Sequence, residues 1–122
     1  MAIEPKYFLI EKDGPVIIWK YNNPPKNLWT TDSVNEYNAL VEELQADPEL
    51  RAGIFTSALP DVFIQHFDVS ILVMLGEMLK QNPDAFPPIP PRPAYHPGPK
   101  VIIAAINARL AGGGLEFAQQ CV

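Results

Sequence analysis

Residues 100–122 have the sequence KVIIAAINARLAGGGLEFAQQCV, which indicates the fold more clearly than any other stretch. The apolar run Val101–Ile106 is typical of a buried strand. Three consecutive glycines, Gly112–Gly114, then precede a helix-like segment that starts at Leu115. Consecutive glycines are costly in backbone entropy. Their place before a helix indicates backbone N–H groups that a ligand can approach, at the positive end of the helix dipole.

Glu116 follows these glycines within the first turn of the predicted helix. A carboxylate beside exposed N–H donors combines a base with a group that stabilises an anion. The same residue is also compatible with a simpler role, because an acidic side chain in the first turn favours the helix dipole. The residues alone leave both interpretations open.

Working outward, further segments complete a pattern that resembles the enoyl-CoA hydratase/isomerase proteins of the crotonase superfamily. The matching segments are IIAAIN (102–107), AGGGLEFA (111–118), GPVIIWKYNNPPKN (14–27), RAGIFTSALPDVF (51–63) and FIQHFDV (63–69). Together they cover nearly the whole chain in the family's order and spacing. The resemblance implies an α/β fold, a crotonase-like (ββα)n spiral. Residues 1–122 would be the N-terminal part of one acyl-CoA-binding domain about twice as long.

The resemblance also implies an activity, that of an enoyl-CoA hydratase or isomerase in fatty acid metabolism. Its substrate is a coenzyme A thioester, and it uses no metal and no separate cofactor. The backbone N–H groups of Phe67 and Gly113 would form an oxyanion hole, and Glu116 would be a catalytic acid/base. A second catalytic glutamate would lie beyond Val122. The implied substrate contacts are His66, Phe67, Asp68, Val69, Ser70 and Gly113.

Two positions depart from the family's pattern. His66 stands where a glycine is usual two residues before Asp68, and Asn107-Ala108 replaces the usual Asn-Gly. A backbone angle that is easy for glycine is costly for histidine, so we expect strain at His66. The His66 side chain is compatible with an acid or base, a contact to a polar acyl group, or an ordinary loop histidine. A lyase or hydrolase acting on a polar acyl-CoA therefore stays open.

Composition narrows the class of protein. The 122 residues are 48% hydrophobic, enough for one core, and the formal charge of −5 argues against a nucleic-acid partner. The single cysteine, Cys121, excludes an internal disulfide and suits a small buried apolar role. The N-terminus has neither a signal peptide nor an apolar span, which predicts a cytoplasmic protein without a membrane partner.

Homotrimers or hexamers are expected from the resemblance. The alternative is a non-catalytic or truncated relative that binds acyl-CoA or only assembles.

The scaffold elements follow from periodicity and breakers. Tyr7–Glu11 and Val16–Tyr21 predict a hairpin of strands. A helix is expected from Thr31 or Ser33, with a capping box between Ser33 and Glu36, to Asp47-Pro48. Its acidic side chains should be solvated. The Asn22–Asn27 segment (NNPPKN) borders the coenzyme A site in the resembled family, and it is also compatible with a plain connecting loop.

In the second half, Ala52–Ser57 predicts another apolar strand. Because it follows the predicted helix, we expect a βαβ crossover. Val62–Phe67 should be a short strand or an extended segment, and Val69–Gln81 a buried or substrate-lining helix. Eight of the fourteen prolines fall between Pro83 and Pro99. That segment predicts a polyproline-rich surface loop or subunit contact, with a proline-motif ligand as a further alternative.

Overall fold

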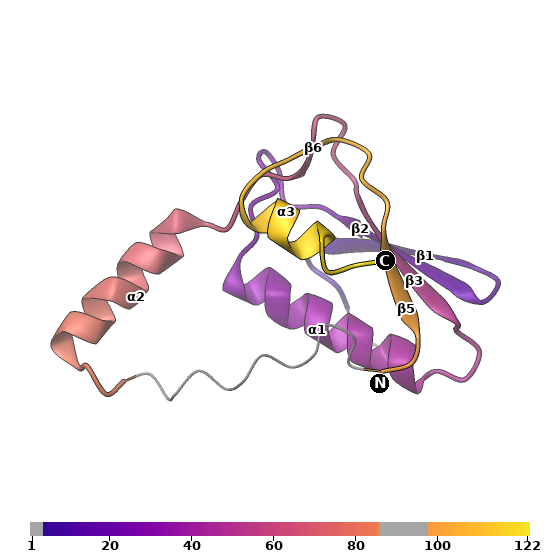
Figure 1. The fold of residues 1–122 in the computed structure, drawn as a ribbon, viewed down its shortest axis with the longest axis horizontal. Coiled ribbons are helices and arrows are strands. Elements are labelled where there is room, and N and C mark those ends of the chain that lie inside the picture. Colours follow the sequence, from indigo (N-terminus) through magenta and orange to yellow (C-terminus); the bar gives the residue numbers. More distant parts are fainter. Residues whose placement is uncertain (1–3, 86–97) are drawn as a thin grey trace.

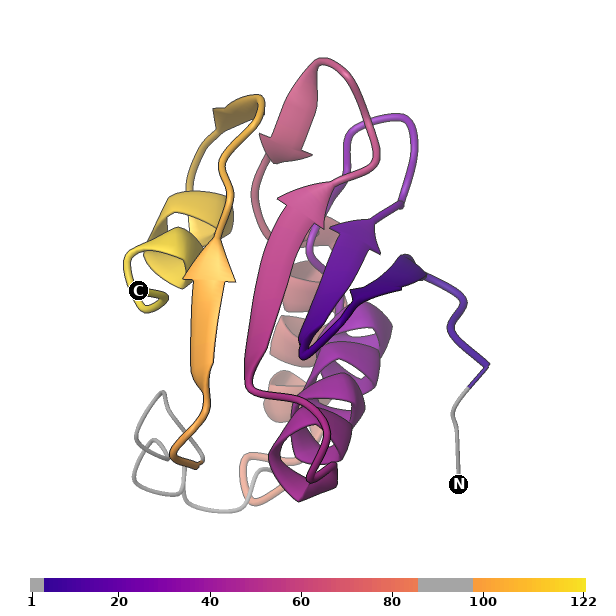
Figure 2. The ribbon, with the colours of Figure 1, turned by 90° about the vertical axis from the view of Figure 1, so that its right-hand side faces the viewer.

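A mixed four-stranded sheet forms the centre of the molecule in the computed structural model, which describes residues 4–85 and 98–122. The sheet order is β1-β2-β3-β5 (Figures 1 and 2). β1 is antiparallel to β2, whereas β3 and β5 run parallel to β2. The strands are β1 (Phe8–Asp13), β2 (Val16–Tyr21), β3 (Ala52–Ser57) and β5 (Val101–Ala104). The predicted hairpin and the parallel crossover are both confirmed.

Helix α1 (Thr31–Ala46) covers one face of this sheet, with Leu40, Val41 and Leu44 buried (Figure 2). Its start is as predicted, but the capping box is not. Thr30 is the N-cap, and its hydroxyl accepts a hydrogen bond from the Ser33 amide, while the Ser33 hydroxyl accepts one from the Thr30 amide. Ser33 thus makes the hydrogen bond to the N-cap amide that was expected from Glu36.

Glu36, which we expected to be solvated, instead ties the N-terminal segment to α1. Its carboxylate accepts hydrogen bonds from the Lys6 amide at 3.1 Å and from the Tyr7 amide at 2.8 Å. Glu36 is thus half-buried and bonded to the N-terminal segment, whereas Ser33 takes the capping-box position.

A second, two-stranded sheet carries the segments of interest. It pairs β4 (Val62–Ile64) in parallel with β6 (Arg109–Leu110), and β6 leads directly to α3 (Gly113–Ala118). The strand expected over Val62–Phe67 therefore ends at Ile64, although Phe67 forms an isolated parallel bridge with Trp29. The helix expected from Leu115 begins two residues earlier.

Aromatic side chains dominate the core and fix α3 in place. Phe117 is only 8% exposed, and its ring centroid lies 4.6 Å from that of Phe55. The rings of Trp29 and Tyr37 lie 5.4 Å and 5.2 Å from the same side chain. Contacts of this kind bury much apolar area in a defined geometry. The short helix that follows the glycines is thus anchored by one aromatic residue.

Helix α2 (Val69–Gln81) has the predicted bounds, and of its two predicted environments burial is wrong, whereas a substrate-lining helix stays a prediction. None of its residues is buried, and in Figure 1 it stands away from the sheet and from α1. The side chains of Leu72, Val73 and Met74 are all more than half exposed. The pattern predicted the type and bounds of the element correctly, because these depend on residues within the segment, whereas burial depends on which other elements contact it. Among the described helices, none is both long and apolar enough to cross a membrane.

The Asn22–Asn27 segment contains a buried asparagine whose side chain makes four hydrogen bonds within the described part of the chain. Asn27 is fully buried, with a φ of 54°, and its side-chain amide donates hydrogen bonds to Tyr21 O, Ser57 Oγ and Phe63 O. Its side-chain oxygen accepts one from the Asn23 amide. The segment is therefore a structural junction between the ends of β2 and β3 and the middle of β4. Most of the proline-rich segment, residues 86–97, lies outside the described residues.

Candidate functional site

Two segments that are far apart in sequence meet at the second sheet. The first loop is residues 65–68, between β4 and α2, and the second loop is residues 105–113, which run from the end of β5 through β6 to the start of α3. The amide nitrogen of Phe67 lies 3.3 Å from the position that a Cβ atom on Gly113 would occupy. Among the hydrogen bonds within residues 4–85 and 98–122, none has the amide of Phe67 or of Gly113 as its donor. The structure thus brings together the two predicted N–H groups and leaves both without a partner in the described chain.

A short backbone ladder with Trp29 sets the direction of the first loop. The Trp29 amide donates to His66 O at 2.9 Å, and the Asp68 amide donates to Trp29 O at 2.8 Å. In a trans peptide the C=O and the following N–H point in opposite directions. Because the His66 carbonyl faces Trp29, the Phe67 N–H faces the other side, away from Trp29.

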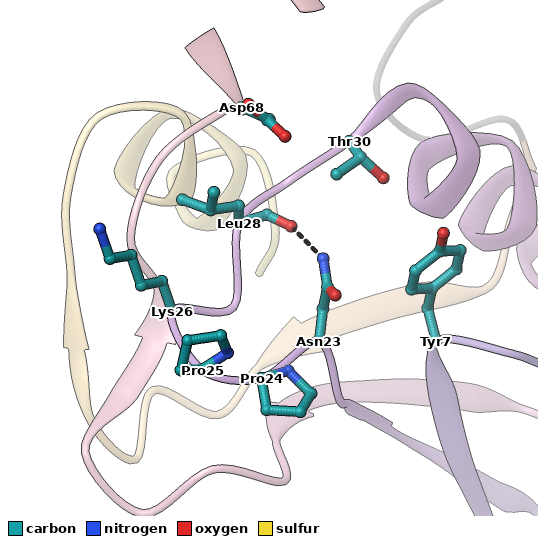
Figure 3. Close-up of a pocket in the computed structure, with 8 residues that line it drawn as sticks. All are labelled: Tyr7, Asn23, Pro24, Pro25, Lys26, Leu28, Thr30 and Asp68. Atoms are coloured by element: carbon teal, nitrogen blue, oxygen red, sulfur yellow. Dashed lines mark hydrogen bonds between the residues drawn. The ribbon is translucent and has the colours of Figure 1, made fainter. Parts of the chain in front are cut away.

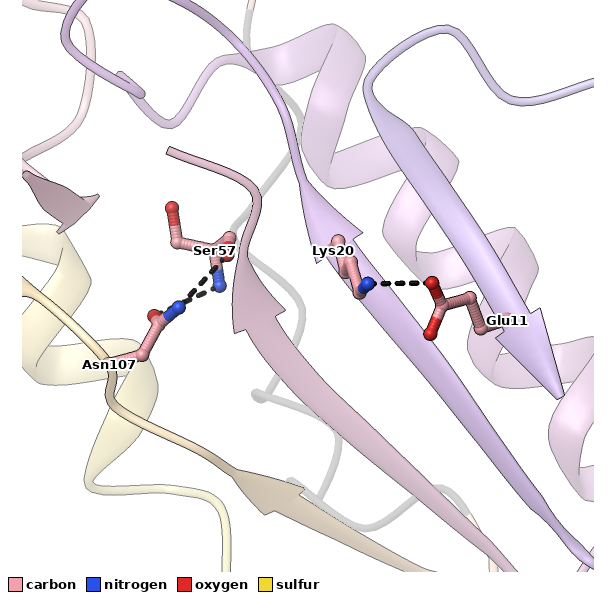
Figure 4. A network of polar contacts seen from close by, with 4 residues as sticks. All are labelled: Glu11, Lys20, Ser57 and Asn107. Atoms are coloured by element: carbon pink, nitrogen blue, oxygen red, sulfur yellow. Dashed lines mark hydrogen bonds and ion pairs between the residues drawn. The ribbon is translucent and has the colours of Figure 1, made fainter. Parts of the chain in front are cut away.

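The second loop is held from both ends. Asn107, just after β5, donates its side-chain amide to Ser57 O at 3.0 Å and accepts from the Ser57 amide at 3.3 Å (Figure 4). The Ala111 amide donates to Ile64 O at 3.1 Å. Figure 4 also shows the Lys20–Glu11 ion pair of 2.7 Å between β2 and β1, which is remote from this loop. Asn107 therefore continues the β3–β5 pairing into the loop despite the unusual Ala108.

Gly112 and Gly114 lie so close to residues of the first loop and of β4 that a side chain would not fit at either position. Gly112 has a φ of 52° and a ψ of −124°, a conformation that side chains disfavour. A Cβ on Gly112 would also lie 2.9 Å from His66 Cβ. A Cβ on Gly114 would lie 2.4 Å from Ile64 O and 2.8 Å from Ile64 Cβ. The glycines thus allow α3 to pack directly on the backbone of β4 and of the first loop.

Replacing Gly114 by alanine should therefore destabilise the fold. The added methyl group would collide with a backbone carbonyl that cannot rotate away, and overpacking of this kind costs about 1–3 kcal/mol. Urea unfolding measures the change. Gly76→Ala is the matched control, because nothing lies within 4 Å of its Cβ position and alanine favours a helix. Equal loss of stability in both variants would contradict the packing argument.

His66 does not carry the expected backbone strain. Asn27 is the only described residue other than glycine with a positive φ, so His66 lies in an ordinary region. Its ring Nδ1 lies 2.8 Å from Phe67 O. The expectation of strain was wrong because it assumed that the usual glycine has a left-handed conformation, which this loop does not use.

Asp68, Val69 and Ser70 form the start of α2. Asp68 is the N-cap, and its carboxylate accepts hydrogen bonds from the Ser70 amide at 2.9 Å and the Ser70 hydroxyl at 2.6 Å. The Ser70 hydroxyl and amide lower the pKa of the Asp68 carboxyl below its usual 3.8. This cap therefore contributes stability above the usual pKa, and loses it as the pH falls through the lowered value. Val69 is 56% exposed.

Glu116 is exposed on the first turn of α3, and its side chain has no hydrogen bond or ion pair to another described residue. Its amide donates to Gly112 O at 3.1 Å. Since α3 has only six residues, the individual amides of the loop matter more than a helix dipole. The described residues contain no cluster of three or more side chains suited to a metal ion.

A hollow of about 270 Å³ adjoins the first loop (Figure 3). Sequence reasoning identified the Asn22–Asn27 segment but not this hollow. A hydrogen bond of 3.0 Å from the Asn23 side chain to Leu28 O closes one wall. One cation and one carboxylate, Lys26 and Asp68, line it. Its lining residues are Tyr7, Asn23, Pro24, Pro25, Lys26, Leu28, Thr30 and Asp68.

Cys121 is a half-buried thiol whose pKa does not favour a nucleophile. Burial raises its pKa to about 11, and its Sγ lies 3.7 Å from Phe117 O. We expect alkylation by iodoacetamide at pH 8 to be at least about 10²-fold slower in the native protein than in urea, because the thiolate is the reactive form. The native rate should then rise with pH up to about 11. Equal native and unfolded rates would show that the thiol is accessible and ionised.

Comparison with known proteins connects this geometry to a family. No protein-family model matches the chain. The mouse mitochondrial enoyl-CoA delta isomerase 1 is 34% identical over 80 residues, which are 64% of this chain and 26% of that protein. A Bacillus subtilis protein named "Probable enoyl-CoA hydratase" is 30% identical over 122 residues, covering 89% of this chain and 42% of its own length.

The solved structure of Pseudomonas aeruginosa DspI is similar throughout. It superposes with a TM-score of 0.75 and 29% identity, over 99% of this chain and 50% of that one. The solved neighbours have the crotonase fold, and this chain matches the N-terminal portion of the longer chains, so the predicted fold class is confirmed. The chain spans half of DspI and less than half of the two curated relatives.

Proposed function

We propose that this chain, which belongs to the enoyl-CoA hydratase/isomerase family of the crotonase superfamily, is part of an acyl-CoA enzyme of that type. The observation that carries the proposal is the close approach of Phe67 to Gly113, whose amides have no hydrogen-bond acceptor within the described residues. The printed names of the relatives refer to enoyl-CoA isomerase and hydratase activities. These names favour a thioester as the molecule that the two amides bind.

In the proposed complex, the thioester carbonyl oxygen accepts hydrogen bonds from Phe67 N–H and Gly113 N–H. Removal of a proton next to the carbonyl, or addition to a conjugated double bond, places negative charge on that oxygen. Two fixed donors stabilise this charge more than the neutral carbonyl, which lowers the barrier to the reaction. Since both donors are backbone atoms, the Phe67 side chain is left to pack against the acyl group or the pantetheine arm.

Glu116 is proposed as the acid/base group supplied by this part of the protein. It follows the second donor by three residues, and it is not engaged by another described side chain. Hydration needs two carboxylates to position and activate one water molecule, whereas a double-bond shift needs a proton carrier. In this proposal the second group comes from outside residues 1–122, from the half of the relatives that the chain does not match.

We propose that the coenzyme A part of the substrate lies in the hollow between the Asn22–Asn27 segment and the first loop. Lys26 supplies a positive charge there for an anionic phosphate, and Asp68 links the hollow to the loop that carries the Phe67 amide. His66, Asp68, Val69 and Ser70 are the other proposed substrate contacts. Assembly into a homotrimer or hexamer is part of the same proposal.

The test is a panel of enoyl-CoA and polar acyl-CoA thioesters, offered to the full-length protein. Absorbance at the conjugated thioester band reports turnover, and titration calorimetry reports binding. Turnover of an enoyl-CoA supports the proposed activity. Tight binding without turnover supports the alternative, a non-catalytic relative. The absence of binding to every thioester would contradict both.

A further inference from the structure

We propose that His66 is a positioning residue that fixes the first amide donor through its own ring. The inference rests on the proposed function, because it concerns the loop that holds the Phe67 N–H. The ring Nδ1 lies 2.8 Å from Phe67 O. A carbonyl oxygen only accepts hydrogen bonds, so Nδ1 carries the proton and donates. The neutral ring is then the Nδ1–H tautomer, with Nε2 unprotonated.

This hydrogen bond completes a set of restraints on two consecutive peptide groups. The peptide between His66 and Phe67 is fixed at its carbonyl by the Trp29 amide, at 2.9 Å. The next peptide is held at its N–H, where the Asp68 amide donates to Trp29 O, and at its carbonyl by the His66 ring. Among the N–H and C=O groups of these two peptides, only the Phe67 N–H is left over, on the side away from Trp29, and its nitrogen lies 3.3 Å from the Cβ position of Gly113. Restraints on both sides of that N–H set its direction.

The second loop provides the room that this arrangement needs. A Cβ on Gly112 would come within 2.9 Å of His66 Cβ and 3.7 Å of its Cα. The histidine therefore packs against bare backbone of the loop that carries the second donor. A glycine at position 66 would make neither the ring hydrogen bond nor this contact, and it would leave the loop more conformational freedom.

The tautomer also limits what the ring itself does. An unprotonated Nε2 accepts hydrogen bonds, so the neutral ring adds no third donor to the oxyanion hole. Its contribution to the reaction then acts through the Phe67 amide. For this reason we distinguish His66 from the catalytic groups and treat it as support for one of them.

Nitrogen-15 NMR of the full-length protein, labelled at histidine, tests the tautomer without reference to activity. We expect the neutral His66 ring to show a protonated Nδ1 and an unprotonated Nε2. The signal is assigned by its loss in His66→Phe, and His96 provides the internal comparison. An Nε2–H tautomer would overturn the proposal, whether or not the protein acts on thioesters.

Kinetics of two variants test the positioning role. His66→Phe keeps a ring but loses the donor, whereas the side-chain amide of His66→Asn occupies the place of Nδ1 and can donate. We expect His66→Phe to lower kcat by about 3–10-fold with KM changed less than twofold, as for one lost hydrogen bond. His66→Asn should recover kcat to within about twofold of wild type.

The outcomes separate the two claims. Equal kcat in wild type and His66→Phe, or equal loss in both variants, would overturn the positioning role while turnover by the wild type still supports the proposed function. An inactive wild type that binds no thioester would contradict the proposed function, and the NMR result would still decide the tautomer. If His66→Phe does not fold, the tautomer and the activity of His66→Asn decide the matter.

Discussion

Glu116→Gln is expected to lower kcat for an enoyl-CoA thioester by about 10²–10⁴-fold, the usual contribution of a general acid or base. Glutamine keeps the size and the hydrogen-bonding geometry of the side chain but cannot take up or release a proton in this role. Glu116 is exposed and has no partner within the described chain, so its replacement should leave the fold unchanged. KM should change little, because the thioester is held mainly by backbone amides in this proposal.

Steady-state kinetics with the full-length protein measure this effect. Glu42→Gln, on the exposed side of α1, is the matched control and should retain wild-type kcat. Binding of a saturated acyl-CoA, measured by calorimetry, should be the same in all three proteins. A wild-type rate in Glu116→Gln would remove this residue from the mechanism but leave the two amides in place.

Gly113→Ala is expected to lower kcat by about 10²–10³-fold, comparable with the loss of one donor from an oxyanion hole. The new methyl group would lie 3.3 Å from the Phe67 nitrogen, beside the first donor. That is a tight contact rather than a collision, because a shift of a few tenths of an ångström would relieve it. The variant should therefore fold, in contrast to the strain expected for Gly114→Ala.

The comparison of kcat with stability makes this prediction specific. Urea unfolding should show a small change in Gly113→Ala, whereas Gly76→Ala should keep wild-type kcat and be at least as stable as wild type. Binding of the acyl-CoA should weaken together with kcat, because the methyl group also excludes the ground-state carbonyl. Full activity in Gly113→Ala would mean that the thioester does not lie between these amides.

The sequence predicted the elements whose signals are local. The bounds of β2, β3 and α2 agree with the structure, since alternation, helical spacing and flanking breakers all act within a few residues. The juxtaposition of Phe67 and Gly113 was different in origin. It came from the resemblance to a family, and Phe67 and Gly113 lie close together in the structure.

What the sequence did not predict depends on distant partners. The prediction that α2 is buried was wrong, because the apolar composition of a helix does not reveal whether another element covers it. The role of Glu36 was missed, because its partners lie 29 and 30 residues away. The pairing of β4 with β6 was also missed, since a two-residue strand such as Arg109–Leu110 carries no periodic signal.

His66 shows how a pattern can mislead. Its substitution for the usual glycine predicted strain, yet the backbone there is ordinary and the positive φ falls on Gly112 instead. A single residue does not reveal which of two contacting loops supplies the unusual conformation. That information became available only when Gly112 and His66 were seen to face each other.

The buried amide of Asn27 has a consequence for how the molecule opens. One side chain joins the ends of β2 and β3 to the carbonyl of Phe63 in β4. The turn that carries Asn27 therefore does not open independently of the sheet, because its opening would leave three buried acceptors without their hydrogen-bond donor. Solvent exchange at this junction should report the cooperative unfolding of the whole sheet. The wall of the hollow is in this sense among the most persistent parts of the molecule, although it is formed by a loop.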